Sequence, residues 1–140
     1  MRKWSRIITL ATFLATPALA QSTIPDLRGT WKGDSESIIA GIGNKHHTGA
    51  AQQDAPELRS MSFTLVIDKQ DGRRVSGVFS SARTSQALIG VLSRTGTLLM
   101  VDKDGYTFGT LLAPDRLEIC YLTASADGRV ASCTELKKQP

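Results

Sequence analysis

The chain contains two histidines, His46 and His47, which are adjacent and are its clearest candidates for binding a metal ion. In an extended chain, neighbouring side chains point to opposite sides, so this pair does not chelate one ion by itself. A third ligand such as Asp54 could complete a weak Zn²⁺ or Cu²⁺ site. The alternative is a solvated loop without a ligand. The sequence favours the loop, because residues 41–56 contain no large apolar side chain after Ile42.

Cys120 and Cys133 are the only cysteines, and their spacing predicts a disulfide. If residues 125–128 form a four-residue loop, Ala124 faces Arg129 and the two cysteines lie directly opposite each other on adjacent strands. A non-hydrogen-bonded antiparallel pair then brings their Cβ atoms close enough for a disulfide. Charged residues share this face, so the bond should lie outside the sheet as a structural cross-link. A redox-active pair would usually have Cys-x-x-Cys spacing.

No pattern typical of an enzyme is found. Ser80-Ser81 lacks the Gly-x-Ser-x-Gly context of a nucleophile elbow. The stretch that starts at Asp102 is similar to part of a calcium loop, but Ala113 stands where a bidentate Glu is needed. No glycine-rich phosphate loop opens a helix. We therefore expect a non-enzymatic protein without a cofactor. The alternative of an enzyme whose catalysis depends on the shape of a cavity stays open.

The first twenty residues have the three parts of a secretory signal peptide. A basic start (residues 2–6) precedes an apolar run (residues 7–20), which closes on a small-x-small motif ending at Ala20. The run is too short to cross a bilayer comfortably, which takes about 20 apolar residues. We expect Sec-dependent export with cleavage after Ala20, and a periplasmic or secreted product. Gln21 stands where a lipoprotein would have cysteine, so no membrane anchor is expected after cleavage.

The predicted mature chain, residues 21–140, is close to neutral. The full sequence has 17 lysines and arginines against 13 aspartates and glutamates, and three of the basic residues lie in the signal peptide, leaving 14 against 13. The basic residues are not clustered, so the chain lacks the charge pattern of a nucleic-acid-binding protein. Its length suits a single domain.

Short apolar strips alternate with turn signals through most of the mature chain. Residues 61–68 alternate apolar and polar side chains, the pattern of a half-buried strand. Asp-Gly pairs at 71–72, 104–105 and 127–128 are strong hairpin signals. Further strips are expected at residues 73–80, 86–93, 97–101, 106–112, 116–123 and 129–136, with 27–32 or 37–40 as the first strand. This pattern predicts an all-β meander of about eight strands, which can close into an up-and-down barrel. An open sandwich is the alternative, and residues 41–56 are expected to form a long mobile loop.

The predicted mature domain opens with the element Gly29-x-Trp31. It resembles the start of calycin barrels, the group of lipocalins and avidin-like proteins. The resemblance implies that Trp31 closes one end of the barrel against a basic residue from a late strand, for which Arg129, Lys137 and Lys138 are candidates. Avidin-like biotin sites use several tryptophans, whereas residues 21–140 contain only Trp31, so biotin binding is not expected.

These features predict an exported barrel that binds either a small apolar ligand in its mouth or a protein at its loops. The candidates for lining a cavity are Phe63, Phe79, Phe108 and Tyr121. The alternative is an inhibitor of a protease or lysozyme that acts through residues 41–56 or through the N-terminal arm. Residues 98–105 resemble the late hairpin of the metalloprotease-inhibitor family, whose members are also eight-stranded barrels. A purely structural role in the cell envelope is a further alternative.

Overall fold

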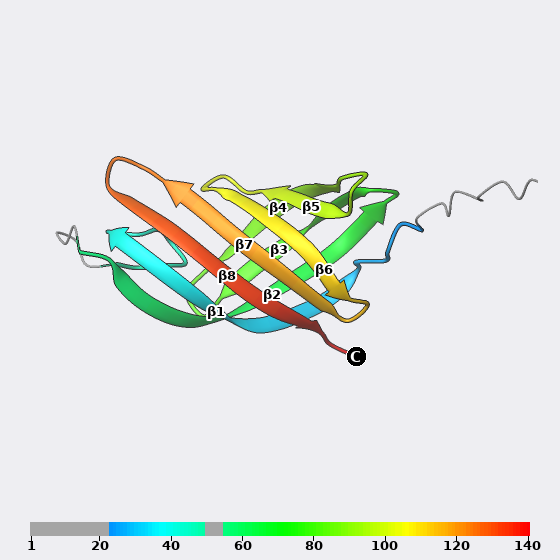
Figure 1. Ribbon diagram of the computed structural model, residues 1–140, viewed down its shortest axis with the longest axis horizontal. Coiled ribbons are helices and arrows are strands. Elements are labelled where there is room, and N and C mark those ends of the chain that lie inside the picture. The colour runs from blue at the N-terminus through cyan, green and yellow to red at the C-terminus, as the bar shows by residue number, and fades with distance from the viewer. Residues whose placement is uncertain (1–22, 50–54) are drawn as a thin grey trace, which may run out of the picture.

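The computed structural model describes residues 23–49 and 55–140, so the predicted signal peptide and Asp54 lie outside the described residues. The described residues form one closed antiparallel barrel without a helix (Figure 1). Its strands are β1 (Gly29–Gly41), β2 (Glu57–Asp71), β3 (Arg74–Ser81), β4 (Ser85–Leu92), β5 (Thr97–Val101), β6 (Tyr106–Ala113), β7 (Arg116–Ala124) and β8 (Gly128–Lys138). The predicted eight-stranded up-and-down barrel is confirmed, and the open sandwich is wrong.

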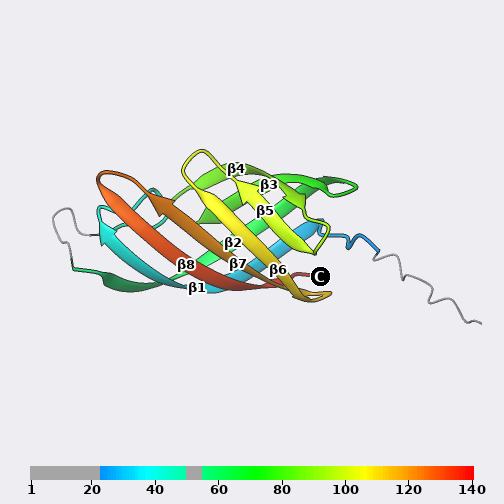
Figure 2. The same ribbon diagram turned by 45° about the horizontal axis from the view of Figure 1, so that its top comes forward.

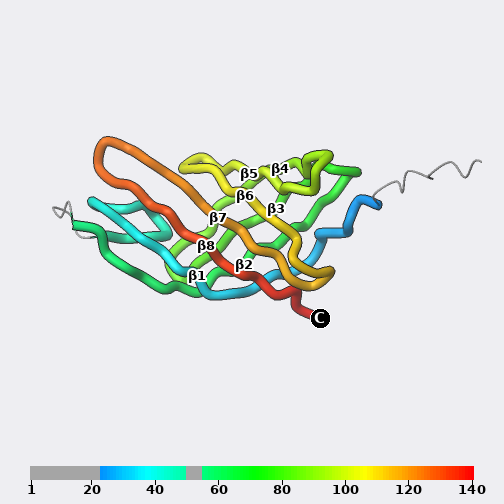
Figure 3. Tube along the Cα trace, viewed as in Figure 1, coloured from blue at the N-terminus to red at the C-terminus, as the bar shows by residue number. Residues whose placement is uncertain are grey.

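Each strand pairs with the next along the chain, and β8 returns to pair with β1 (Figure 2). This order places the connections alternately at the two ends of the barrel, as the path of the chain shows (Figure 3). One end carries both the N-terminal segment and the C-terminus, and we call it the closed end. The other end carries the β1–β2 and β7–β8 connections, and we call it the mouth. No helix in the described part of the chain is long and apolar enough to cross a membrane.

Strand alternation fills the interior of the barrel with apolar side chains. Large aliphatic residues occupy the half nearer the closed end: Leu65, Ile67, Val75, Leu92, Leu98, Leu117 and Leu136. The turn between β2 and β3 is the predicted Asp-Gly hairpin, in which Gly72 takes the positive φ (56°) that favours glycine. The residues nearer the mouth are more polar, and they include the buried Ser35, Ser37, Gln86, Ser132 and Thr134.

Trp31 lies inside the closed end and is fully buried. Its indole Nε1 donates a hydrogen bond of 2.9 Å to the carbonyl oxygen of Leu27, which lies beside it in the core. Of the three basic residues considered as partners, Lys138 places its Nζ 5.2 Å from the centre of the Trp31 ring. That ammonium also donates a hydrogen bond to the carbonyl oxygen of Asp26 (3.2 Å). The segment before β1 is therefore tied to the last residue of β8.

The disulfide is confirmed. Cys120 and Cys133 are bonded, they are partners in the β7–β8 register, and their Cα atoms are 4.1 Å apart. Ala124 pairs with Arg129, as the four-residue loop requires. Cys133 is exposed, so the bond lies on the outside of the barrel.

Phe108 does not line a cavity, and that prediction is wrong. Its side chain is 46% exposed, because β6 turns Thr107, Gly109 and Leu111 toward the interior instead. Residues 106–112 carry apolar side chains on both faces, so their alternation does not determine which face is inside. The strand register places Phe108 opposite Leu99 on β5 and opposite Cys120 on β7.

Phe108 belongs to a continuous apolar strip on the outer surface of β4 to β7. We call this strip the outer apolar band; it consists of Ile89, Val91, Leu99, Val101, Tyr106, Phe108 and Leu122, all exposed. The pairing places its members in two adjacent rows that cross the strands. A water-facing sheet surface is ordinarily polar, so a strip of this kind is unusual.

Candidate functional site

Residues 42–49 form a compact turn that enters the mouth, and we call them the histidine turn. Gly43 and Thr48 pair as an isolated bridge, and the backbone N of Asn44 donates to the carbonyl oxygen of His47 (2.6 Å). The side-chain Oδ1 of Asn44 accepts hydrogen bonds from the backbone N of His46 (3.0 Å) and of His47 (2.7 Å). An Asn side chain that caps the following backbone in this way stabilises a tight turn.

Both histidines are buried, at 4% exposure for His46 and 1% for His47. The solvated loop that the composition favours is therefore wrong for these two residues. The tight turn is the physical reason, because its backbone is not extended and both rings can enter the barrel. Asp54, the third proposed metal ligand, lies outside the described residues. Among the residues described, no group of three or more His, Cys, Asp or Glu side chains could hold a metal ion.

The two imidazoles contact three aromatic rings inside the mouth, and we call these five side chains the mouth cluster. The ring of His46 lies edge-on to Phe79 (5.5 Å between centroids) and to Phe63 (5.9 Å). The ring of His47 lies 5.2 Å from Phe63 and stacks on Tyr121 at 5.8 Å. Phe63 and Phe79 stack on each other at 4.7 Å. Strands β2, β3 and β7 thus bring together three of the four predicted cavity residues around the two histidines.

Polar groups hold the cluster in place. The Nδ1 of His46 lies 3.0 Å from the Ser81 hydroxyl, and the Nδ2 of Asn44 donates to the Tyr121 hydroxyl (3.1 Å). The Nδ1 of His47 lies 3.3 Å from Asn44 Oδ1, which can only accept a hydrogen bond. The proton of the neutral His47 ring therefore lies on Nδ1, and its Nε2 presents a lone pair.

Three buried polar atoms near the cluster have no hydrogen-bond partner. In the described part of the chain, four buried side-chain atoms lack one, and three of them are His46 Nε2, His47 Nε2 and Gln86 Oε1. Gln86 lies on β4 opposite Phe79, and its amide nitrogen donates to Asp104. A buried polar group without a partner costs about 1–3 kcal/mol, so such groups are rare, and a bound molecule is one explanation for them. The mouth therefore offers unused hydrogen-bonding capacity beside aromatic surface.

Burial keeps both imidazoles neutral at pH 7. Burial, with a smaller contribution from the charge of His46, lowers the pKa of His47 to about 4. Burial also lowers the pKa of His46, against the opposing effects of the nearby Gln86 side-chain amide, which favours a protonated ring by hydrogen bonding, and of the charges of Asp102 and Asp104. The pKa of Tyr121 is raised, mainly by burial. A neutral, acceptor-rich site suits an uncharged ligand that carries N–H or O–H groups.

A cleft of about 620 Å³ opens beside the cluster at the rim of the mouth, between residues 101–106 and 122–130. It lies next to Tyr121, since a side chain added at Gly105 would meet the Tyr121 hydroxyl at 2.5 Å. The mouth itself is occupied by the two imidazoles and the aromatic rings around them.

Sequence reasoning missed Asn44, Ser81 and Gln86. A usable signal existed for Asn44, because an Asn two positions before His46 can cap a turn. Gln86 lies on the same face as the buried Leu88, and this polar residue in an apolar row could have been noticed. Ser81 lies at the end of β3, and its role depends on which loop reaches it.

Comparison with known proteins does not assign the chain to a family, and the resemblance to calycin barrels is not confirmed. No protein-family model matches the chain, and no curated protein sequence matches it. Among solved structures, the chain is similar to the S-type phycobiliprotein lyase CPES from Guillardia theta, with 15% sequence identity and a TM-score of 0.38. The likeness covers 81% of this chain and 89% of the lyase chain. At these values no function transfers from the lyase to this protein.

Proposed function

We propose that this protein is an exported, non-enzymatic barrel that binds a small ligand in its mouth, with the histidine turn as a removable lid. The observation that carries the proposal is the set of three buried, unpartnered polar atoms beside the aromatic rings of the mouth cluster. The disulfide supports export, because such bonds persist in oxidising compartments.

The chemistry of the site selects the class of ligand. Gln86 Oε1 is an acceptor that stays in the mouth when the histidine turn leaves, and Phe63, Phe79 and Tyr121 offer ring faces. A flat, uncharged aromatic molecule with an N–H or O–H donor satisfies both features. Such a molecule can replace the imidazoles when the histidine turn leaves the mouth.

The lid role rests on how the histidine turn is attached. Hydrogen bonds within the turn involve Asn44 and Gly49, whereas its side-chain bonds to the strands are those to Ser81 and Tyr121. The backbone N of Ile42 also donates to the carbonyl oxygen of Asp127 (3.0 Å), so Ile42 marks the fixed end of the turn. Residues 43–49 can therefore move as a unit when two side-chain hydrogen bonds and the ring contacts break. Its two buried imidazoles then free space between rings that already face one another.

Fluorescence titration with N-phenyl-1-naphthylamine, an uncharged aromatic amine with one N–H, tests this function. We expect an increase in fluorescence on binding to the wild-type protein. Gln86→Leu should weaken binding about 3- to 10-fold through the lost acceptor, and Phe79→Ala should weaken it further. Phe108→Ala is the matched control and should leave binding unchanged. Binding that is lost in Phe108→Ala but kept in Gln86→Leu and Phe79→Ala would contradict the proposal and locate the probe on the outer apolar band.

The outer apolar band favours a second function, the binding of a protein surface. Its seven side chains are 38–65% exposed, and at about 150–250 Å² for a large side chain this is on the order of 600 Å² of apolar surface. Each partner of a standard interface buries about 800 Å². We propose a second copy of this chain as the partner, because two such sheet faces can pack on each other with twofold symmetry.

Sedimentation velocity measures this association. Leu99→Lys and Tyr106→Lys should convert a dimer into a monomer, whereas Leu58→Lys, an exposed residue outside the band, should not. A wild-type protein that stays monomeric at millimolar concentration would overturn the dimer.

A further inference from the structure

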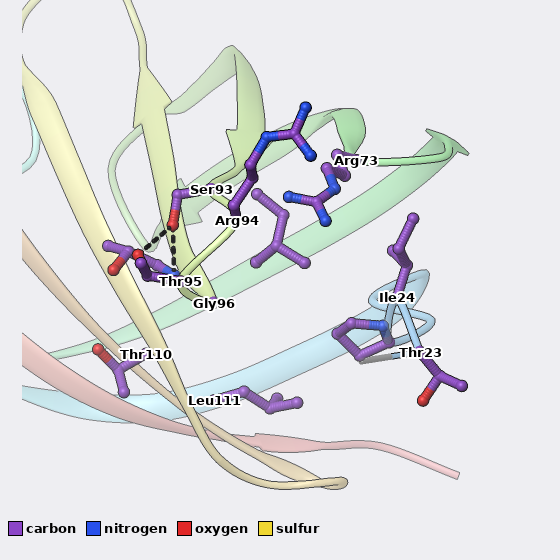
Figure 4. A pocket seen from close by; sticks show the side chains of 12 residues that line it. Thr23, Ile24, Arg73, Ser93, Arg94, Thr95, Gly96, Thr110 and Leu111 are labelled. Carbon is purple, nitrogen blue, oxygen red and sulfur yellow. Dashed lines mark hydrogen bonds between the residues drawn. The ribbon is translucent and has the colours of Figure 1, made fainter. Parts of the chain in front are cut away.

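A second cleft lies at the closed end, at the other end of the barrel from the histidine turn (Figure 4). Its volume is about 360 Å³, within the range of small-molecule sites. Its walls come from the segment before β1 (residues 23–25), the β2–β3 turn, the β4–β5 loop (residues 93–96) with the strand ends beside it, and β6. We call it the arginine cleft, because Arg73 and Arg94 both line it.

The two guanidinium groups lack the counter-charges that arginines ordinarily find. No aspartate or glutamate is among the described residues that line the cleft. The nearest carboxylate in sequence, that of Asp71, is paired with Arg74. Across residues 23–49 and 55–140, neither Arg73 nor Arg94 forms an ion pair.

Arg73 gives the sharper observation. Its Nη1 is buried and has no hydrogen-bond partner, the fourth such atom in the described residues. A buried guanidinium N–H without an acceptor is costly, and a second arginine in the same cleft adds repulsion between like charges. An anion bound between the two side chains would remove both costs, since guanidinium groups bind carboxylates and phosphates with paired hydrogen bonds.

The rest of the cleft lining indicates which kind of group is attached to the anion. Ile24, Pro25, Leu92 and Leu111 supply an apolar wall. The β4–β5 loop is already ordered by its own bonds, because Ser93 Oγ accepts from the backbone N of Thr97 (2.9 Å) and lies 2.9 Å from Thr95 Oγ1. The loop therefore needs little reorganisation on binding. The lining combines one charged edge with one apolar wall.

We propose that the arginine cleft binds a small organic anion with an apolar tail, such as a short-chain carboxylate. The head group bonds to Arg73 and Arg94, and the tail lies on Leu92 and Leu111. This site is separate from the mouth, so the proposal does not depend on the ligand proposed there.

Titration of the ¹⁵N-labelled protein with hexanoate, followed by NMR, tests the proposal. We expect shifts of the amide signals of residues 73 and 92–97, and tighter binding in the order butanoate, hexanoate, octanoate. Arg73→Gln should weaken hexanoate binding at least 10-fold and Arg94→Gln about 3- to 10-fold. Arg73→Lys should bind with an intermediate affinity, because it keeps the charge and loses the paired hydrogen bonds. Arg83→Gln, an exposed arginine at the mouth, is the matched control and should bind like the wild type.

Inorganic phosphate, an anion without a tail, and hexyltrimethylammonium, a cation with the same tail, are two control ligands for this titration. We expect phosphate to bind more weakly than hexanoate and the cation not to bind. Equal affinity of hexanoate for the wild type and for a folded Arg73→Gln variant would overturn the proposal. Phosphate binding together with carboxylate affinities that do not depend on chain length would overturn the apolar tail. Amide shifts confined to residues 42–49 would overturn the location.

Discussion

Acid should release the histidine turn from the mouth, and His47 sets the pH range. Its pKa is about 4 in the folded protein against 6.5 for an unperturbed imidazole. The buried ring is therefore held neutral, whereas in the unfolded chain it is protonated below pH 6.5. The stability that this burial contributes is complete above pH 6.5, decreases as the pH falls from 6.5 to about 4, and is lost below that.

The size of the effect follows from the same pKa difference. A shift from 6.5 to about 4 corresponds to about 3 kcal/mol, at about 1.4 kcal/mol for each pKa unit. Solvent screening reduces the energy that such a shift yields, so we expect about 2 kcal/mol to be realised. His46 changes stability in the same direction, because burial lowers its pKa too, although Asp102 and Asp104 oppose that shift.

Urea unfolding between pH 4 and 8 measures this loss. The wild type should lose about 2 kcal/mol more than the double variant His46→Gln/His47→Gln over the range from pH 7 to pH 4. The double variant cancels the contribution of carboxylates such as Asp26, whose pKa lies below its usual range because of hydrogen bonds with Arg28. Direct NMR titration of the imidazole protons gives the pKa of each ring. A His47 pKa near 6.5, or equal pH profiles for the two proteins, would refute the reasoning.

Three further predictions concern the framework around the sites. Replacement of Cys120 and Cys133 by serine should cost about 3 kcal/mol and lower the Tm by about 10 °C; calorimetry with an unchanged Tm would contradict this. Trp31→Phe loses the hydrogen bond to Leu27 and part of the ring volume, so the free energy of unfolding, followed by circular dichroism, should fall by about 2 kcal/mol. Gly43→Ala should expel the histidine turn, because Gly43 has a φ of 70° and an added Cβ would lie 1.9 Å from the His47 carbonyl oxygen. Amide exchange of residues 42–49 should then accelerate at least 10-fold, and Gly72→Ala, with open space around its Cβ, is the control that should leave that exchange unchanged.

The strands and the disulfide could be predicted because their signals are local. Alternation over residues 61–68 and the turn at 125–128 determine pairing between neighbours in sequence, and the position of Cys120 opposite Cys133 follows from that register. Phe108 was assigned to the wrong face because both faces of β6 carry apolar side chains. Choosing between them depends on which face the remaining seven strands enclose.

The mouth cluster could not be predicted, because it depends on contacts between distant parts of the chain. The histidine turn reads as a polar loop, and its burial requires the rings of Phe63 and Tyr121, which come from two different strands. The missing partners of His47 Nε2 and Gln86 Oε1 are visible only after the barrel has closed around them. The same holds for the arginine cleft, whose two arginines come from separate loops.

The pairing of β8 with β1 has a consequence for how the protein folds. The contact that joins Lys138 to Asp26 spans 112 positions in sequence, so the last seam of the barrel carries the longest loop-closure entropy in the fold. Proteins rich in such distant contacts fold slowly. We expect the seven hairpins between neighbouring strands to form first and the β1–β8 seam to form last. Until then both edge strands are exposed and can pair with another chain, so protein concentration during refolding should determine how much of the material reaches the closed barrel.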